Sequence, residues 1–367
     1  MTDTLISVEE LRTKLENKER IQVIDIRPLE EREEWKIPGS VHVDVYHQLK
    51  SGKEDVFSTM DFLKDETVVT VCAAGKTSLI AMEQLRKKGV KVYSLEGGMR
   101  SWTRAWNTAI TEDKHLKIIQ VRRTGKGCLS YIIGSDGEAL VIDPSLDIEV
   151  YISIAKNNNW KITHVLDTHI HADHFSRAKR LATTVKAQLL MPPNTALQYP
   201  YEKIQDQQLI SFGLTNIQAI ATPGHTSDSF SYLLQEKYLF SGDTLFTKGV
   251  GRPDLKANTD QAKIKAGILY DSLQKILSLS KDIIVFPGHI SEPVSFDGKT
   301  IANSLGNIID TVPLLTLEKQ LFVQALLANI PLTPPNYEKI VALNYKGDIK
   351  ERELIGLEAG ANRCAIS

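Results

Sequence analysis

Residues 168–174 read Thr-His-Ile-His-Ala-Asp-His, and these seven positions are the most informative part of the chain. His169, His171 and His174 bring three imidazoles into six consecutive residues, and Asp173 adds a carboxylate. Imidazole and carboxylate together suit divalent transition metals, whereas calcium and magnesium prefer oxygen ligands alone. Independent core or surface histidines seldom group so densely. The stretch therefore predicts a metal centre.

Four short apolar runs each stop just before a histidine or an aspartate. Val165–Asp167 precedes His169, Ala219–Ala221 precedes His225, Leu239–Phe240 precedes Asp243, and Ile283–Phe286 precedes His289. Runs of this kind indicate β-strands. We expect their ends to meet at one edge of a sheet, where these side chains complete the metal centre. Upstream, Leu129–Gly134 and Ala139–Asp143 flank a Ser-Asp-Gly turn, which predicts a hairpin.

Residues 1–108 alternate short strands with helical patterns, as in an α/β unit with a mainly parallel sheet. The expected strands are Val23–Ile26, Val41–Val43, Val68–Val71 and Val92–Leu95, and the expected helices are Val8–Asn17, Thr77–Lys88 and Met99–Trp106. The polar stretch Asn107–His115 is the expected seam. We therefore predict domains at 1–110 and 111–367, with a helix-rich accessory segment at about 312–367 that closes over the site.

Length and composition exclude several classes of protein. The chain has 367 residues, which favours two domains, and its 44 Lys+Arg against 45 Asp+Glu give a formal charge of −1. No basic field indicates nucleic acid or an anionic membrane, and no apolar run approaches the roughly 18 residues of a membrane span. The charged N-terminus lacks the apolar core of a secretory signal, and three cysteines suit a reducing compartment. We expect a cytoplasmic protein.

Cys72 follows the run Val68–Val71 and begins the loop Cys-Ala-Ala-Gly-Lys-Thr, which leads into a helix. The helix N-terminus and Lys76 would lower the pKa of the thiol, and Gly75 would allow the loop to curl around an anion. A buried inert cysteine at a strand end is an equally ordinary interpretation. The local pattern alone leaves both open.

The metal-site stretches resemble the metallo-β-lactamase superfamily. The matching pieces, in the family's order, are Val141-Ile142-Asp143-Pro144, the His-x-His-x-Asp-His run, Pro223-Gly224-His225, Gly242-Asp243 and Pro287-Gly288-His289. The resemblance implies an αβ/βα sandwich with the site at one edge of paired sheets, which would follow the α/β unit of residues 1–108. Fold alone does not give the reaction.

Two segments resemble the persulfide dioxygenase branch of that family. They are Thr244-Leu245-Phe246 with Gly249-Val250-Gly251-Arg252-Pro253-Asp254, and Pro334-Pro335-Asn336-Tyr337 with Asn344 downstream. The resemblance implies one Fe(II) per chain, held by His169, His225 and Asp243, with positions left open for sulfur and O₂. Arg252 is a candidate catalytic residue that would hold Asp254 or a substrate carboxylate.

The same resemblance makes His171, Asp173, His174 and His289 partners that orient the iron ligands or order water. All seven positions of a two-metal hydrolase are nevertheless present. His171 and Asp173 would then be ligands of a zinc pair that generates hydroxide for thioester hydrolysis, as in the glyoxalase II branch. One iron and two zinc ions both stay open at this point, and the character of the N-terminal domain favours iron.

Residues 1–108 resemble a rhodanese (sulfurtransferase) domain. The matching pieces are Asp25-Ile26-Arg27, Ile37-Pro38-Gly39-Ser40, the Cys-x-x-Gly-x-Thr loop at 72–77, and Leu95-Glu96-Gly97-Gly98 with Trp102. The resemblance implies that Cys72 is a nucleophile that carries a persulfide and that Ala73, Ala74, Gly75, Lys76 and Thr77 bind the substrate. Ala73 replaces the arginine of many members, and Lys36 replaces a histidine.

Together the two resemblances imply a bifunctional enzyme of sulfide detoxification. A persulfide dioxygenase converts a low-molecular-weight persulfide, such as glutathione persulfide, with O₂ and water into sulfite and the thiol. A rhodanese moves sulfane sulfur between a persulfide, sulfite and thiosulfate. The alternatives are a dinuclear zinc thioester hydrolase and a rhodanese domain that serves only for docking. No motif distinguishes the thiol carrier, and a homo-oligomer is the ordinary expectation.

The remaining cysteines have simpler expectations. Cys128 lies at the start of a predicted strand and is expected in the core, and Cys364 is expected to be exposed in a mobile C-terminal tail. Neither is predicted to be catalytic.

Overall fold

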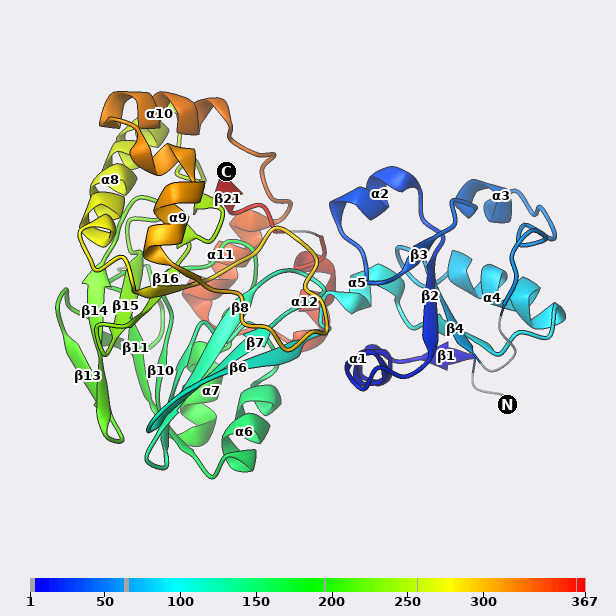
Figure 1. Ribbon diagram of the computed structural model, residues 1–367, viewed down its shortest axis with the longest axis horizontal. Coiled ribbons are helices and arrows are strands. Elements are labelled where there is room, and N and C mark those ends of the chain that lie inside the picture. Colours follow the sequence, from blue (N-terminus) through cyan, green and yellow to red (C-terminus); the bar gives the residue numbers. More distant parts are fainter. Residues whose placement is uncertain (1–3, 63–65, 195, 256, 361, 367) are drawn as a thin grey trace.

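The chain forms two α/β domains of unequal size, joined end to end in the computed structural model (Figure 1). The structure describes residues 4–62, 66–194, 196–255, 257–360 and 362–366. Within these ranges, none of the helices combines the length and the apolar character that crossing a membrane requires.

The smaller, N-terminal domain is built on a parallel sheet in the order β1-β5-β4-β2-β3. Its strands are β1 (Leu5–Ile6), β2 (Ile21–Asp25), β3 (Val41–His42), β4 (Thr67–Val71) and β5 (Val92–Leu95). Its helices are α1 (Val8–Glu16), α2 (Leu29–Glu34), α3 (Tyr46–Lys50), α4 (Thr77–Lys87) and α5 (Gly98–Trp102). Val68 and Val69 belong to separate apolar clusters, so both faces of the sheet are covered. This confirms the expected α/β unit.

The larger domain contains two facing sheets. The first has seven strands in the order β12-β11-β10-β9-β8-β7-β6, and the second has six in the order β13-β14-β15-β16-β19-β20. The first comprises β6 (Asn107–Asp113), β7 (Leu116–Arg122), β8 (Leu129–Ser135), β9 (Glu138–Ile142), β10 (Lys161–Leu166), β11 (Gln188–Met191) and β12 (Glu202–Lys203). The second comprises β13 (Leu209–Phe212), β14 (Thr215–Ala221), β15 (Phe230–Leu234), β16 (Tyr238–Gly242), β19 (Ile284–Pro287) and β20 (Asn303–Ser304).

Helices cover the outer face of each sheet, which gives the expected αβ/βα sandwich. Ile133 of β8 packs in the cluster between the sheets, whereas its neighbour Ile132 packs in the cluster under the first pair of helices. That pair is α6 (Ile148–Asn157) and α7 (Ala178–Val185). The second sheet is covered by α8 (Thr259–Leu277), α9 (Leu305–Thr311), the 3₁₀ turn η1 (Pro313–Thr316) and α10 (Lys319–Ala328).

The stretch Asn107–His115, expected to connect the two domains, is mostly a β-strand, β6. All seven residues of β6 pair antiparallel with β7, so the strand belongs to the larger domain's sheet. Asn107 and Ala109 are buried while polar residues between and after them face outward, as in an edge strand. The domain boundary near residue 111 stays a prediction, and it falls within this strand.

The C-terminal segment returns to the site edge of the sandwich. It contains α11 (Tyr337–Lys346), α12 (Glu351–Leu357) and β21 (Ala365–Ile366). β21 pairs with β18 (Gly249–Gly251), which in turn pairs with β17 (Leu245–Phe246). Figure 1 shows α11, α12 and the C-terminus gathered at the side of the sandwich nearest the smaller domain.

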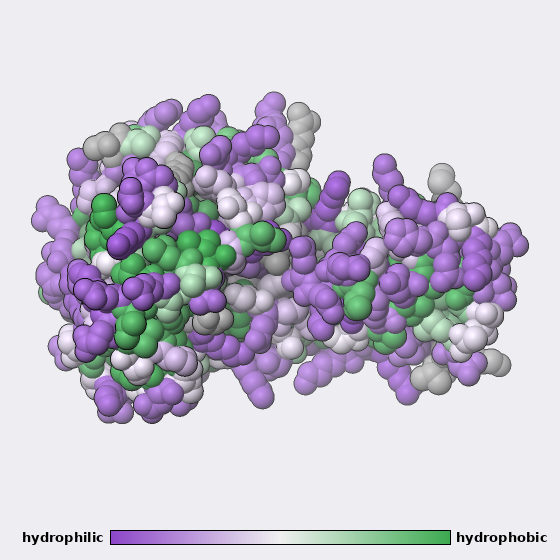
Figure 2. All heavy atoms as spheres, turned by 90° about the horizontal axis from the view of Figure 1, so that it is seen from above, coloured by the Kyte–Doolittle hydropathy of each residue, from purple (hydrophilic) through white to green (hydrophobic). Residues whose placement is uncertain are grey.

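The two domains meet through specific contacts. The indole Nε1 of Trp35 donates to the carbonyl of Thr124 at 3.0 Å, and Arg363 Nη2 of the larger domain donates to Glu34 Oε1 at 3.1 Å. A Cβ on Gly125 would lie 1.8 Å from the carbonyl oxygen of Trp102, so the backbones approach as closely as only glycine permits. Figure 2 shows a largely hydrophilic smaller domain and more apolar side chains at the surface of the larger one.

Candidate metal centre and sulfur loop

The four predicted strand ends deliver their polar side chains to one buried place. His169 follows β10 of the first sheet, whereas His225, Asp243 and His289 follow β14, β16 and β19 of the second. All four side chains are at most 3% exposed. The centre therefore lies where the edges of the two sheets meet, as the sequence predicted.

His169, His225 and Asp243 form a triad of possible metal ligands. Their ligand atoms lie within 4.8 Å of one another. Asp243 Oδ2 is 3.9 Å from His169 Nε2 and 3.7 Å from His225 Nε2, and it is buried with no hydrogen-bond partner. A buried carboxylate oxygen left unpaired is costly unless a cation satisfies it. The donor set therefore fits a divalent transition metal.

Hydrogen bonds orient both histidines so that Nε2 faces the triad. His225 Nδ1 donates to the carbonyl of Arg252 at 2.7 Å. His169 Nδ1 lies 2.9 Å from Thr168 Oγ1, which donates to Asp143 Oδ2 at 2.9 Å. Because the Thr168 hydroxyl proton goes to Asp143, His169 Nδ1 is the donor to Thr168. Both rings then keep the Nε2 lone pair for a metal.

Burial sets the protonation of this triad. Burial lowers the pKa of His169 well below its ordinary value and also lowers the pKa of His225, so both rings are neutral. Burial alone would raise the pKa of Asp243, but the charge and hydrogen bond of His289 outweigh it and hold that pKa below its ordinary value. Two neutral imidazoles and a carboxylate are the protonation states that metal binding requires.

The neighbouring group of Cys128, Asp173, His174 and His289 is closed by internal bonds. His289 Nδ1 contacts Asp243 Oδ1 at 2.6 Å, and His289 Nε2 contacts Asp173 Oδ2 at 3.0 Å. His174 Nδ1 lies 3.0 Å from Asp173 Oδ1. Burial would lower the pKa of His174 and His289, but Asp173 raises that of His174 to about 9 and, with Asp243, that of His289 well above its ordinary value. These side chains pair mainly with one another.

His171 lies beside the triad, with its ring 4.3 Å from that of His169, but its Nε2 contacts other carboxylates. Its Nε2 lies 3.2 Å from Asp143 Oδ1 and 3.9 Å from Asp167 Oδ1. Burial raises the pKa of Asp167 to about 6, with a further contribution from Asp143. His171 Nδ1 is buried without a hydrogen-bond partner. His171 is therefore in the centre, as predicted, but its bonded nitrogen serves two carboxylates that the sequence did not single out as site residues.

Arg252 is fully buried, and its guanidinium is used within the protein. Nε and Nη2 donate to the two carboxylate oxygens of Asp254 at 2.8 and 2.7 Å. The remaining donors go to the carbonyls of Leu332, Arg363 and Pro331. The sequence left Asp254 or a substrate carboxylate as the partner of Arg252, and in the structure that partner is Asp254. No N–H is left for a substrate, so we assign Arg252 a positioning role, through its carbonyl on His225.

Both cysteines outside the smaller domain lie at the metal centre. Cys128 Sγ is 3.4 Å from Asp173 Oδ2 and 3.8 Å from His174 Nδ1. Cys364 is 2% exposed, and its sulfur groups with Asp243 and His289. The expectation of an exposed, mobile Cys364 is wrong, because pairing of β21 with β18 draws the tail into the fold. Cys128 is buried as expected.

Three polar residues of the C-terminal segment support the centre. The amide of Asn344 donates to the carbonyls of His171 and His174 at 2.8 and 2.9 Å, and Asn362 Nδ2 lies 3.1 Å from Asp173 Oδ2. Glu358 bonds Arg123 at 2.6 Å and Arg177 at 2.8 Å. The end of the segment thus contacts the site through residues of which the sequence singled out Asn344 but not Glu358 or Asn362.

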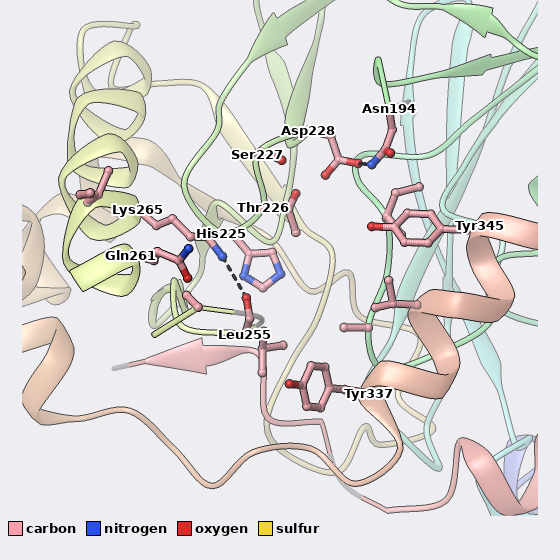
Figure 3. A pocket seen from close by; sticks show the side chains of 15 residues that line it. Asn194, His225, Thr226, Ser227, Asp228, Leu255, Gln261, Lys265, Tyr337 and Tyr345 are labelled. Atoms are coloured by element: carbon pink, nitrogen blue, oxygen red, sulfur yellow. Dashed lines mark hydrogen bonds between the residues drawn. The ribbon is translucent and has the colours of Figure 1, made fainter. Parts of the chain in front are cut away.

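A cavity of about 360 Å³ opens beside His225. Figure 3 shows Lys265 of α8 on one side of the His225 ring and Asp228 with Asn194 on the other. Tyr337 and Tyr345 of α11 form the facing wall. The cavity therefore gives a small molecule access to one ligand of the triad.

Cys72 lies between β4 and α4 in a curled loop, as predicted. Its sulfur is 3.3 Å from Ser78 Oγ, and its carbonyl accepts from the N–H of Met99 at 2.9 Å. Gly75 has φ +77°, and a Cβ there would lie 2.8 Å from the backbone nitrogen of Gly97, so only glycine fits. Cys72 is 2% exposed. Ala73 and Ala74 are half-buried, Gly75 and Thr77 are buried, and Lys76 is exposed.

A cavity of about 120 Å³ lies beside this loop, at the boundary between the domains. Ala73 and Arg100 line it from the smaller domain, and Gly125, Ala359 and Gly360 line it from the larger one. The segment that reaches the metal centre through Asn362 thus also borders the sulfur loop. The two predicted sites remain separate groups of residues.

Comparisons with known proteins agree with the division into two domains. The profile of the rhodanese-like domain matches residues 7–105, and that of the metallo-beta-lactamase superfamily matches residues 123–289. Hydroxyacylglutathione hydrolase from Francisella philomiragia is 35% identical over 161 residues, which are 43% of this chain and 61% of that protein. The chain thus covers less than two thirds of that relative.

Two solved structures have the same fold as the larger part of the chain. A metallo-beta-lactamase from Staphylococcus aureus has a TM-score of 0.59 at 28% identity and covers 64% of this chain and 74% of its own. ETHE1 from Myxococcus xanthus has a TM-score of 0.54 at 28% identity and covers 62% of this chain and 97% of its own. The chain is therefore a rhodanese-like domain followed by a domain of the metallo-beta-lactamase superfamily.

Proposed function

We propose that the protein is a bifunctional enzyme of sulfur metabolism. Its larger domain oxidises a low-molecular-weight persulfide with O₂ and water to sulfite and the free thiol, using one Fe(II) held by His169, His225 and Asp243. Its smaller domain carries sulfane sulfur as a persulfide on Cys72 and exchanges it with sulfite and thiosulfate. Sulfite made by the first reaction is then an acceptor for the second.

The observation that carries this proposal is the difference in hydrogen bonding among the possible metal ligands. In the triad, the ligand atoms of two imidazoles and one carboxylate converge and Asp243 Oδ2 stays unpaired, whereas both oxygens of Asp173 are hydrogen-bonded. A second group with an unpaired carboxylate oxygen, Asp143, Asp167 and His171, offers a single imidazole. Two histidines and one carboxylate are the ligand set of mononuclear non-haem iron, which keeps positions open. Iron in such a site supplies the redox chemistry that activates O₂.

The protein's own part is to hold and shield these ligands. The carbonyl of Arg252 and the hydroxyl of Thr168 hold the two imidazoles in the tautomer that binds metal. His289 bonds Asp243 Oδ1, which leaves Oδ2 directed at the triad. Burial excludes bulk water from all three ligands.

The comparisons support the same reading. The likeness to ETHE1 from Myxococcus xanthus covers nearly all of that chain and favours the persulfide dioxygenase branch. The fused rhodanese-like domain gives such an enzyme a partner that handles the same sulfur species. Within that domain, the curled loop at Cys72 and the left-handed Gly75 suit an anion-holding sulfur carrier.

A dinuclear zinc thioester hydrolase is the second candidate. It is favoured by the likeness to hydroxyacylglutathione hydrolase and by two buried nitrogens without partners, Nδ1 of His171 and Nε2 of His174. In that case Asp173 would have to exchange its hydrogen bonds to His174 and His289 for a metal ion. The mononuclear site requires no such rearrangement.

Oxygen uptake with glutathione persulfide, measured on anaerobically purified, iron-loaded protein together with metal content, separates the two. We expect uptake, sulfite formation and about one iron per chain. Asp243→Ala should abolish uptake, and Cys72→Ser should leave it intact. Two zinc ions, no uptake and hydrolysis of an acyl-glutathione would instead establish the hydrolase.

Cyanolysis tests the smaller domain. Wild-type protein loaded with a persulfide donor should release sulfane sulfur to cyanide as thiocyanate, and Cys72→Ser should not. Cys128→Ser is the matched control, because Cys128 is equally buried but lies at the metal centre. A domain that serves only for docking would give no thiocyanate from Cys72.

A further inference from the structure

The cavity beside His225 has an unusual distribution of charge. Among the described residues that line it, Asp228 and Lys265 are the two that carry a full charge, since burial keeps His225 neutral. The rest of the wall is formed by apolar and uncharged polar side chains, among them Leu255, Tyr337 and Val341. One anion and one cation thus face a space next to a triad ligand.

Asp228 is a fixed, desolvated anion. It is 6% exposed, and its Oδ2 accepts a hydrogen bond from Asn194 Nδ2 at 2.7 Å. A carboxylate accepts several hydrogen bonds, so the bond to Asn194 orients the group without saturating it. A buried carboxylate attracts a cationic donor strongly and repels a second anion.

Lys265 is the complementary cation. Its Nζ donates to the carbonyl of Leu255 at 3.1 Å, which uses one of the three N–H groups of the ammonium. Burial lowers the pKa of Lys265, against the attraction of Asp254 and Asp228. Figure 3 shows Lys265 beside the His225 ring and Asp228 on the other side of the cavity, next to Asn194. A ligand that touches both must carry its two charges at separate points.

We infer that this cavity selects persulfides whose carrier thiol ends in an amino-acid zwitterion, with its ammonium on Asp228 and its carboxylate on Lys265. This inference rests on the proposed function, because it assumes that the reacting sulfur faces the triad. Cysteine persulfide is the smallest such carrier, and any larger thiol with a free amino-acid end fits the same rule. Carriers rich in phosphate are disfavoured, since Asp228 repels anions.

The two charges contribute unequally. Asp228 is the more deeply buried, so a carrier without an ammonium leaves it without a cationic partner in a desolvated place, and we expect a loss of about 10- to 100-fold in affinity. Lys265 is partly exposed, and water compensates for a missing carboxylate. Removing the ligand carboxylate should therefore cost only about fivefold.

A series of four ligands of matched length tests this pattern. S-Methylcysteine carries both charges, S-methylcysteamine only the ammonium, 3-(methylthio)propionate only the carboxylate, and 2-(methylthio)ethanol neither. Calorimetry on the full-length iron-loaded protein under anaerobic conditions measures their binding without turnover. S-Methylcysteine should bind most tightly. 3-(Methylthio)propionate, which lacks the ammonium, should bind more weakly than S-methylcysteamine, which lacks the carboxylate. Equal affinities across the series would overturn the inference.

Two variants assign each preference to a residue. In Asp228→Asn, an ammonium on the ligand should no longer increase affinity, while a carboxylate still should. In Lys265→Gln, a carboxylate should no longer increase affinity, while an ammonium still should. Lys263→Gln, an exposed lysine on the same helix, should change neither. If Asp228→Asn does not fold, Lys265→Gln and the ligand series on the wild type still decide, and a Lys265→Gln protein with unchanged preferences would contradict the assignment.

Oxygen uptake with the persulfides of the four parent thiols separates this inference from the proposed function. A preference in kcat/KM for cysteine persulfide of about fivefold over cysteamine persulfide and of about tenfold or more over the two carriers without an ammonium supports both. Uptake at equal kcat/KM for all four leaves the dioxygenase standing and overturns the selectivity. No uptake with any of them overturns the proposed function, whatever the calorimetry reports.

Discussion

Two groups of potential metal-binding side chains lie next to each other in the larger domain, and they differ in which of their atoms are hydrogen-bonded. The triad of His169, His225 and Asp243 leaves its inward-facing atoms free. The group around Asp173 joins its carboxylate and imidazoles in pairs. Residue types alone make both groups candidate sites. The two groups differ in their carboxylates, because Asp243 keeps one buried oxygen without a hydrogen-bond partner while both oxygens of Asp173 are hydrogen-bonded.

The largest expected effect comes from removing the triad carboxylate. Asp243→Asn keeps the size of the side chain but removes the charge on which both the metal and His289 depend. We expect metal affinity and oxygen uptake to fall by more than about 100-fold, beyond the range for a residue that only orients a ligand. Metal analysis after dialysis, together with oxygen electrode traces, measures both quantities. Retained iron with full uptake would remove Asp243 from the ligand set.

Asp173→Asn is the corresponding change in the supporting group. Because this residue orients His174 and His289 and does not face the triad, we expect about one iron per chain to remain and activity to fall about 10- to 100-fold. Metal stoichiometry is the deciding measurement. A drop from two bound metals to one would show that Asp173 is itself a metal ligand.

Glu358 supports both groups from outside, and its removal should affect stability first. It is 1% exposed and bonded to Arg123 and Arg177, so Glu358→Gln leaves two buried cations without their anion. We expect a loss of about 3 kcal/mol in the free energy of unfolding. Thermal unfolding followed by circular dichroism measures it, with the exposed Glu292→Gln as control. An unchanged melting temperature would contradict this role.

The same carboxylate predicts a dependence on pH. Burial would raise the pKa of Glu358, but Arg177 and Arg123, with a smaller contribution from His174, lower it from 4.5 to about 2. Because the pKa of Glu358 is lower in the folded state, its carboxylate makes its full contribution to the free energy of unfolding above pH 4.5. That contribution is lost as the pH falls toward 2. The stability difference between wild type and Glu358→Gln should therefore shrink across this interval. A difference that stays constant from pH 5 to 2 would argue against it.

Cys128→Ser is expected to have the smallest effect. The thiol lies 3.4 Å from Asp173 but outside the triad, so iron content should stay near one per chain and oxygen uptake should change less than about threefold. Loss of metal in this variant would make Cys128 a ligand and would place a second metal in the supporting group. Metal content in this variant thus decides whether the group around Asp173 binds a metal of its own.

Local pattern was enough to predict much of this site. Each of His169, His225, Asp243 and His289 comes within four residues of the end of a strand, so the order of residues already implied their convergence. The hairpin of β8 and β9 and the loop at Cys72 were equally visible, because turn and glycine chemistry is local. These features depend on neighbours within about ten residues.

The features that were missed depend on distant partners. Asn362 contacts Asp173 across 189 positions, and Glu358 contacts Arg123 across 235, so no local signal marks either pair. Cys364 looked exposed because the pairing of β21 with β18 cannot be read from the tail itself. The direction in which His171 points depends on Asp143 and Asp167, which are side-chain contacts of the finished fold.

The position of Asn362 and Cys364 in the chain also bears on how the centre acquires its metal. Both come after every other residue of the centre, and β21 joins a sheet whose other strands lie more than a hundred residues earlier. Because synthesis runs from the N-terminus, all three triad ligands have left the ribosome before the segment that walls them in. During translation the ligands are open on that side, so an ion meets a more accessible site than the finished protein offers.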